Sequence, residues 1–438
     1  MSAVHSHSRL QLLCYSVLAF PLMFVGLPLY VFAPEFYAAE FGVSLVTLGF
    51  VMLGLRGVDA LQDLLVGSLS DHFHRHRRKV MAVGMVALAS GFWMVFHPSQ
   101  QHTLLFFALG MLVSALGFSI LSINLQALGA LWNANIHERT RITSWREAFG
   151  LLGLLAAAVA PSLLGYTADA PRAFHLLTLL YVPLLVISGL IFFRWMGRVT
   201  FTPPEKKQKK KHFSRLYQRW NLQFFGIYTL NTLASAVPGV LVIFFITDRL
   251  QAAEHTGLFL LLYFLSGACS MPLWQWVARR IGKKQAWMAS MLLAASAFLA
   301  CVTLAAGDTV AFALLCLVAG MTLGADLALP PSILADQIDR ARDHDVASYY
   351  FSTTTFLSKT ALALATGVVL PILGALGYQP GTVTDYGVTV YLSYAYAVIP
   401  AILKVSVALW LWYFIKSIIN SGDRYEVRRN ACQHSHPA

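Results

Sequence analysis

The chain has 438 residues, of which 57% are hydrophobic and 12% are charged, and its mean hydropathy is +0.63. A soluble protein of this length cannot bury so much apolar surface, so the composition excludes a soluble globular fold. The formal net charge of +12 comes from basic residues clustered in short loops between apolar runs, and this placement argues against a nucleic acid partner.

Apolar runs of about 18 or more residues recur along the chain and predict membrane-spanning helices. Only helices or closed barrels satisfy the backbone within lipid, and the sequence lacks the short alternating strands of a barrel. We therefore predict an all-α polytopic membrane protein with twelve transmembrane helices in two six-helix bundles. The runs lie near residues 11–33, 44–70, 80–97, 103–132, 145–168, 174–197, 220–247, 254–280, 284–306, 310–333, 347–376 and 388–417.

The basic loops predict which side of the membrane each end faces. When loops are assigned alternately to two sides, nearly all Lys and Arg residues fall on one side, and the other holds only Arg172 and Arg249. This asymmetry satisfies the positive-inside rule, so we expect both termini to be cytoplasmic and the protein to be integral to the plasma (inner) membrane. The first apolar run is too long for a signal peptide, so we expect it to be retained.

A polar segment near the middle of the chain, Thr202–Arg215 (TPPEKKQKKKHFSR), divides six spans from six. We expect an N-terminal bundle over 1–200, a cytoplasmic linker over 201–219 and a C-terminal bundle with a cytoplasmic tail over 220–438. The lysine run suits anionic lipid headgroups, although a solvated positive-inside loop explains it equally well. A basic tight loop follows both the second and the eighth span, in GSLSDHFHRHRRK and WQWVARRIGKK, which is the spacing of a two-bundle transporter.

The second span carries three charged residues, Arg56, Asp59 and Asp63, whose spacing places them along one stripe of a helix. An ionised side chain near the bilayer centre costs about 3 kcal/mol, so such residues generally face a bundle interior or a watery cavity and mark an ion or substrate path. The structural alternative is an ion pair between Arg56 and Asp59 that ties helices together.

The eleventh span supplies a candidate partner, Lys359, in the stretch FSTTTFLSKTALALATG. This lysine lies too deep in its span to reach water easily by snorkelling. Thr355 precedes it by one turn on the same helical face. With Lys359, the cluster contains two acids and two bases and is neutral without a bound cation.

Other polar residues within spans are weaker signals for a substrate site. Asn124 and Gln126 lie in the fourth span, and Asp326 lies deep in the tenth. Arg146 and Glu147 open the fifth span, where they suit either a site or an ordinary helix start. The residues that we assign to substrate binding are Asn124, Arg146, Asp326 and Thr355.

These residues together resemble the glycoside-pentoside-hexuronide cation symporters of the major facilitator superfamily, the melibiose permease family. The resemblance covers nearly the whole chain and rests on several motifs in combination. The matching residues are Arg56, Asp59 and Asp63 in span 2; Gly67 and Asp71 before the basic loop; Glu138, Arg139 and Arg146 at span 5; Ala335, Asp336 and Asp339 ending span 10; and Thr355 and Lys359 in span 11.

The resemblance implies a cation site for Na+, Li+ or H+ made of Asp59, Gln62 and Asp63. It places Lys359 beside this site, between cation and substrate, and Arg146 and Thr355 toward the substrate. We assign coupling to Arg56 and Lys359. A gate is expected in the loops after spans 2 and 8, where basic side chains would hold the carbonyl ends of neighbouring helices. The gating residues are Gly67, Asp71, Arg75 and Arg279.

The chain departs from the sugar-transporting members at three positions. Those members carry an aspartate in span 1 and another in span 4 that hold substrate hydroxyls. Here span 1 has no acid in its core, span 4 offers Asn124, and Leu64 replaces a proline. Because two strong acceptors are missing, a sugar is disfavoured as substrate. The related vertebrate lysolipid symporters make a lysolipid or another amphipath the alternative.

We therefore predict a secondary active transporter that couples H+ or Na+ to the symport of a small organic solute by alternating access, with no further cofactor. An enzyme is not expected, because the sequence holds no GxSxG, HExxH or Walker lysine motif and its five cysteines form no CxxC pair. A non-transporting receptor or scaffold is the alternative of another class. The expected partners are the substrate and the lipid bilayer, and we expect a monomer.

A charge count favours H+ as the coupling ion. The charges of Arg56, Asp59, Asp63 and Lys359 sum to zero, and a neutral cluster attracts a bare metal cation less than a negative one does. Protonation needs only one of the carboxylates. If Na+ is the coupling ion, Asp59 and Asp63 are the residues that would hold it.

Overall fold

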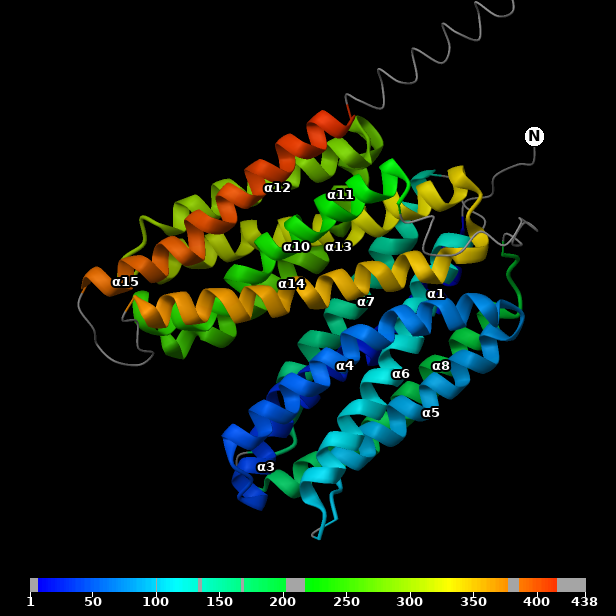
Figure 1. The fold of residues 1–438 in the computed structure, drawn as a ribbon, viewed down its shortest axis with the longest axis horizontal. Helices are drawn as coiled ribbons and strands as arrows, with labels where there is room; N and C mark the ends of the chain where they lie inside the picture. The colour runs from blue at the N-terminus through cyan, green and yellow to red at the C-terminus, as the bar shows by residue number, and fades with distance from the viewer. Residues whose placement is uncertain are drawn as a thin grey trace, which may run out of the picture.

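The structure is a computed structural model that describes residues 7–99, 101–132, 136–166, 169–201, 217–376 and 386–415 (Figure 1). Most of the expected linker, 201–219, and of the C-terminal tail lies outside these residues. The helices of the first half are α1 (Arg9–Ser16), α2 (Ala19–Phe24), η1 (Pro28–Phe32), α3 (Ala33–Phe41), α4 (Leu45–His72), η2 (His74–His76), α5 (Arg77–Phe96), α6 (Thr103–Leu131), α7 (Ile136–Leu163) and α8 (Ala170–Met196). Those of the second half are α10 (Arg219–Phe244), η3 (Phe245–Arg249), η4 (Ala253–His255), α11 (Thr256–Ile281), α12 (Lys283–Cys301), α13 (Thr309–Ala341), η5 (His344–Val346), α14 (Ala347–Ala375), α15 (Tyr386–Ser393) and η6 (Tyr394–Val398).

The described residues contain ten helical stretches that are long and apolar enough to cross a membrane. The first, Arg9–Phe41, joins α1 to α3, and the last, Val390–Ile415, contains η6. The charged helix α4 and the 19-residue helix α12 bring the number of long helices in this part of the chain to twelve. The predicted all-α membrane fold is therefore confirmed.

Each half of the chain has an apolar core, and the core around Trp287 also includes Ala127, Ala130 and Leu131 of α6. The N-terminal core contains Phe92, Phe107 and Phe174, each fully buried. The C-terminal half has a core around Trp287 and another around Phe312. Figure 1 shows the two halves as two bundles, one of α1 to α8 and one of α10 to α15.

The two bundles meet at one end and diverge toward the other (Figure 1). At the end where they meet, α4 and α13 finish and α5 and α14 begin, and the basic residues 75–79 lie there. We call this the basic end and the opposite one the open end. Hydrogen bonds and ion pairs between the bundles lie at the basic end and extend as far as Lys359. The site residues therefore lie where the bundles begin to separate.

Candidate functional site

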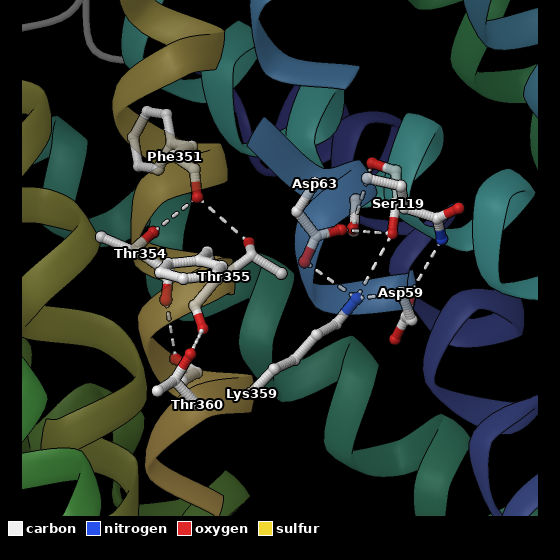
Figure 2. A network of polar contacts seen from close by, with 12 residues as sticks. Asp59, Asp63, Ser119, Phe351, Thr354, Thr355, Lys359 and Thr360 are labelled. Atoms are coloured by element: carbon white, nitrogen blue, oxygen red, sulfur yellow. Dashed lines mark hydrogen bonds and ion pairs between the residues drawn. The ribbon is translucent and has the colours of Figure 1, made fainter. Parts of the chain in front are cut away.

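The predicted acids of α4 and the predicted lysine of α14 meet across the bundle interface (Figure 2). Lys359 Nζ lies 2.7 Å from Asp59 Oδ1 and 2.8 Å from Asp63 Oδ2. Asp59 and Asp63 share a face because they are four residues apart on one helix. One ammonium group from the C-terminal bundle thus bridges two carboxylates of the N-terminal bundle.

Two neutral side chains complete this ion cluster. Ser119 of α6 donates a hydrogen bond of 2.6 Å to Asp63 Oδ1, and Gln62 donates one of 2.9 Å to Asp59 Oδ1. The side chain of Asp63 is fully buried, whereas 23% of the Lys359 side chain is exposed. Carboxylate, hydroxyl and amide oxygens are the ligands that hard cations prefer, so the cluster suits a cation in the place of the Lys359 ammonium.

Arg56 does not join this cluster. Its side chain is exposed, and its guanidinium carbon lies 5.9 Å from the ring centroid of Tyr30. Within the described part of the chain no ion pair connects Arg56 to Asp59 or Asp63, so the alternative of an Arg56–Asp59 helix tie finds no support. The paired groups are two carboxylates and one ammonium, which leaves the cluster with one net negative charge when both acids are ionised.

A cavity of about 360 Å³ adjoins the cluster on its open-end side. Its walls are mostly apolar, and the charged residues on them are Arg56, Asp59 and Lys359. Asp63 lies behind this wall, one helical turn nearer the basic end. The apolar lining residues are Leu22, Met23, Val25, Gly26, Leu29, Ala115, Phe118, Leu154, Leu362 and Ala363.

At the basic end, Asp71 closes the contact between α4 and α14. Its carboxylate accepts hydrogen bonds from the backbone N–H groups of Ser348 at 3.0 Å and Tyr349 at 2.8 Å. These N–H groups lie in the first turn of a 29-residue helix, where the helix dipole favours a negative charge. Arg77 Nη2 lies 3.2 Å from the same carboxylate and donates to Ser348 Oγ at 2.9 Å.

The charges in this contact are the reverse of those that we expected. We expected basic side chains to hold carbonyl ends of helices, whereas here an acid holds the N–H end of α14. The basic residue beside Asp71 is the buried Arg77, and the expected Arg75 is exposed. Residue 77 points inward because it opens α5, while residue 75 lies in the short turn of η2.

A second set of ion pairs joins the bundles at the same end. Arg139 of α7 contacts Asp336 at 3.3 Å and Asp339 at 3.0 Å, both at the end of α13. Within the C-terminal bundle, Lys283 of α12 contacts the same Asp336 at 2.5 Å. The expected gating residue Arg279 is exposed, and the basic residue that crosses between the bundles here is Arg139. The motif residues at spans 5 and 10 are thus brought together.

Gly67 allows the close approach of α4 to α14 at the basic end. A Cβ atom at this position would lie 2.1 Å from Ser352 Oγ and 2.9 Å from the carbonyl oxygen of Ser348. The second distance involves backbone, which a rotamer change cannot relieve. Glycine at this position is therefore required for the contact between Asp71 and the first turn of α14.

Replacing Gly67 by Ala is expected to loosen the basic end, at a cost of about 1–3 kcal/mol for overpacking. Hydrogen exchange at the amides of Ser348 and Tyr349, measured by mass spectrometry, should become faster. Gly54 is the matched control, since it lies on the same helix and a Cβ atom added there would have no neighbour within 4 Å. Equal exchange in the Gly67→Ala and Gly54→Ala variants would contradict this role.

The other predicted substrate residues make contacts within the protein, although Asn124 Oδ1 and Arg146 Nη1 are buried without a hydrogen-bond partner among the described residues. Asn124 is fully buried and donates to Ser70 Oγ and to the Ile120 carbonyl, each at 2.8 Å. Thr355 donates to the carbonyl of Phe351 in its own helix (Figure 2). Arg146 is buried and pairs with Glu147 next to it. In this conformation these side chains do not line the cavity beside Lys359.

Asp326 lies in a second charged cluster, inside the C-terminal bundle. Its carboxylate lies 2.6 Å from Nζ of Lys404, a lysine of the last span that is 1% exposed. It also accepts hydrogen bonds from Asn231 at 3.0 Å, Trp287 at 3.0 Å and Ser235 at 3.2 Å. Lys404 donates further to Asn231 Oδ1 at 2.8 Å. The cluster is saturated and neutral, so Asp326 is not available to a substrate here.

Sequence reasoning missed Ser119 and Lys404. A lysine in the middle of an apolar run is the same signal that pointed to Lys359, so Lys404 could have been found. Ser119 carries no such signal, because small hydroxyl residues are common in membrane helices and pack against any neighbour.

Comparison with known proteins identifies related transporters. The sequence profile of a family described as MFS/sugar transport protein matches residues 14–416. The human sodium-dependent lysophosphatidylcholine symporter 1 is 31% identical over 125 residues, which are 27% of this chain and 23% of that protein. A sphingosine-1-phosphate transporter of Mus musculus is 30% identical over 147 residues, 32% of this chain and 29% of that protein. The Bacillus subtilis symporter YnaJ is 24% identical over 276 residues, 59% of each chain. The chain therefore matches less than two thirds of the length of each of these relatives.

Solved structures share the fold along nearly the whole chain. A bacterial homologue of the iron transporter ferroportin in its outward-facing state aligns with a TM-score of 0.71 at 16% identity, covering 92% of this chain and 98% of that one. The Escherichia coli fucose:proton symporter aligns with a TM-score of 0.68 at 14% identity, again covering 92% and 98%. At these identities the likeness concerns the fold alone, and it confirms the predicted two-bundle architecture.

Proposed function

The chain belongs to the MFS/sugar transport protein family, and on that premise we propose that it is a secondary active transporter that couples cation binding at Asp59 and Asp63 to the movement of an amphipathic solute. The observation that carries this proposal is the bridge from Lys359 to both carboxylates. This bridge is at once the candidate cation site and a contact between the bundles. A cation that binds the two acids therefore changes the stability of the bundle interface.

The open end faces the outside of the cell in this proposal. The orientation follows from the basic loops at the closed end, because the positive-inside rule assigns such loops to the cytoplasm. Both termini are then cytoplasmic, and the bundle arrangement is an outward-facing one. The Asp71 contact with α14 and the Arg139 pairs with α13 would hold this conformation by closing the cytoplasmic side.

Na+ is the coupling ion in this proposal, in place of the H+ that the charge count favoured. That count included Arg56, whose guanidinium makes no ion pair with the acids in the described part of the chain. Without Arg56 the paired groups carry one net negative charge, which attracts a metal cation more strongly than a neutral cluster does. The human relative is named a sodium-dependent symporter, which supports the same choice.

The cycle follows from competition for the two carboxylates. In the outward-facing state Lys359 holds Asp59 and Asp63 and keeps α14 against α4. Na+ that enters through the cavity replaces the ammonium between the carboxylates, with Ser119 and Gln62 supplying neutral oxygens. The released Lys359 side chain then faces the cavity, where it can meet a negative group of the substrate. The bundles rock only when the ion site and the cavity are both filled or both empty.

The substrate class is an amphipath with an anionic headgroup. The cavity walls are mostly apolar, which suits an alkyl chain, and Arg56 and Lys359 lie together on its charged side. A sugar needs several polar partners, and the cavity offers few. Two of the relatives are named for lysophosphatidylcholine and for sphingosine-1-phosphate, and these names support an amphipathic substrate.

The purified protein in lipid nanodiscs should be stabilised by a lysophospholipid, more strongly in Na+ buffer than in choline buffer. A ligand at 100 times its Kd stabilises the folded state by about 2.7 kcal/mol, which a thermal unfolding scan resolves. A monoacylglycerol of the same chain length controls for the alkyl chain, and the Arg56→Gln variant controls for the headgroup. Stabilisation by a simple galactoside at sub-millimolar concentration, without any by the lysophospholipid, would contradict the assignment.

A further inference from the structure

Two histidines from different helices meet at the open end of the N-terminal bundle, away from the ion cluster. His97 follows the last residue of α5, and His175 lies in the second turn of α8. His97 Nε2 lies 2.8 Å from His175 Nδ1. The ring centroids are 5.1 Å apart with an interplanar angle of 74°. The two ring nitrogens therefore face each other directly.

The ring of His97 is held in place from two sides. Its Nδ1 lies 3.0 Å from the backbone carbonyl oxygen of Trp93. The Trp93 indole also stacks on the imidazole, with centroids 4.1 Å apart and planes 8° apart. A carbonyl only accepts, so Nδ1 of His97 carries the proton and Nε2 presents its lone pair toward His175.

This arrangement is typical of histidines that bind metal ions. Such residues almost always donate their second ring N–H to a carbonyl or carboxylate, which fixes the tautomer and the ring orientation. Two nitrogens bound to one tetrahedral ion at about 2.0–2.1 Å each are about 3.3 Å apart. Because His97 Nε2 accepts, the observed 2.8 Å contact is a hydrogen bond donated by Nδ1–H of His175. Metal binding therefore moves this proton to Nε2 of His175 and widens the distance by about half an ångström, for which the exposed ring of His175 has room.

We propose that His97 and His175 form a two-histidine site for a divalent transition metal of borderline softness, namely Zn²⁺, Ni²⁺ or Cu²⁺. Within the described residues no group of three His, Cys, Asp or Glu side chains could hold a metal, so water fills the remaining positions. Arg172, three residues before His175 on α8, opposes the ion by its charge and limits the affinity. A bound metal would join the end of α5 to the start of α8.

The site is tested by metal binding to the full-length protein carrying a purification tag without histidine. Calorimetric titration with Zn²⁺ should lose one equivalent in the His97→Ala and His175→Ala variants. The other histidines give the same background in every variant. His102→Ala is the matched control, since it is an exposed histidine at the same end, and it should keep every equivalent.

Cu²⁺ electron paramagnetic resonance gives a second readout on the same variants. The wild-type spectrum should contain a component with two nitrogen ligands, and either alanine variant should lack it while keeping its metal-free unfolding temperature. Unchanged Zn²⁺ stoichiometry and an unchanged Cu²⁺ spectrum in His97→Ala would overturn the proposal.

Discussion

Replacing Asp63 by Asn is expected to abolish ion-driven accumulation of substrate and to leave substrate exchange in place. The buried carboxylate of Asp63 lies 2.8 Å from Nζ of Lys359, and in the proposed function it is a ligand of the cation. Removing one charged ligand costs about 1.5–3 kcal/mol, or about 10–150-fold in cation affinity. Exchange across the membrane needs no net ion movement, so counterflow should continue at a reduced rate. Both activities are measured in proteoliposomes with a radiolabelled substrate.

The variant should still fold, because Lys359 keeps its 2.7 Å contact with Asp59 and no buried charge is left alone. Glu254→Gln is the matched control. It also turns an acid into its amide, but the Glu254 side chain is exposed and lies near the open end. If Asp59→Asn and Asp63→Asn both accumulate substrate as the wild type does, the coupling site is not where we place it.

Replacing Lys404 by Met is expected to destabilise the C-terminal bundle strongly. The lysine is 1% exposed, and its loss leaves the carboxylate of Asp326 buried without a counter-charge. Breaking a buried ion pair by removing one partner costs about 3–5 kcal/mol. The unfolding temperature of the protein in detergent, followed by tryptophan fluorescence, should fall well below that of Lys79→Met, which removes an exposed lysine.

The double variant distinguishes a structural pair from a transport site. Neutralising both partners, as in Asp326→Asn with Lys404→Met, leaves no buried charge and should recover most of the lost stability. Because this cluster is saturated and lies apart from the cavity beside Lys359, the double variant should also keep the Na+ dependence of transport. Loss of that dependence in a stable double variant would place Asp326 and Lys404 in the coupling machinery.

The main elements of the ion cluster could be predicted because their signal is local. A charged residue in an apolar run is visible without knowing the fold, and Asp59, Asp63 and Lys359 are three such residues. Their meeting across two bundles was expected because the acids needed a basic partner, but the predicted neutral count was wrong to include Arg56. Arg56 is also a charged residue in an apolar run, yet its side chain lies over Tyr30. Helical spacing predicts only roughly which side of a helix a residue lies on, so it did not separate Arg56 from the two acids.

The remaining site residues depend on tertiary contacts that a sequence does not display. Asn124 lies in α6, a helix that is apolar all round, so no periodicity tells which face a polar residue takes, and it binds Ser70. The Asp71 carboxylate accepts hydrogen bonds from N–H groups 277 and 278 residues away, at the start of α14. No feature of the sequence near Asp71 predicts this contact. Several neighbouring basic residues fitted the predicted gate equally well. In the structure Arg77 and Lys283 are buried, whereas Arg75 and Arg279 are exposed.

The central claim is that Na+ competes with Lys359 for Asp59 and Asp63, and the ion dependence of uptake tests it most directly. The measurement is accumulation of a radiolabelled lysophospholipid in proteoliposomes under an inward Na+ gradient, and under an inward pH gradient in Na+-free buffer. We predict accumulation with the Na+ gradient and none with the pH gradient alone. Accumulation driven by the pH gradient in the absence of Na+, with no further gain when Na+ is added, would contradict the account.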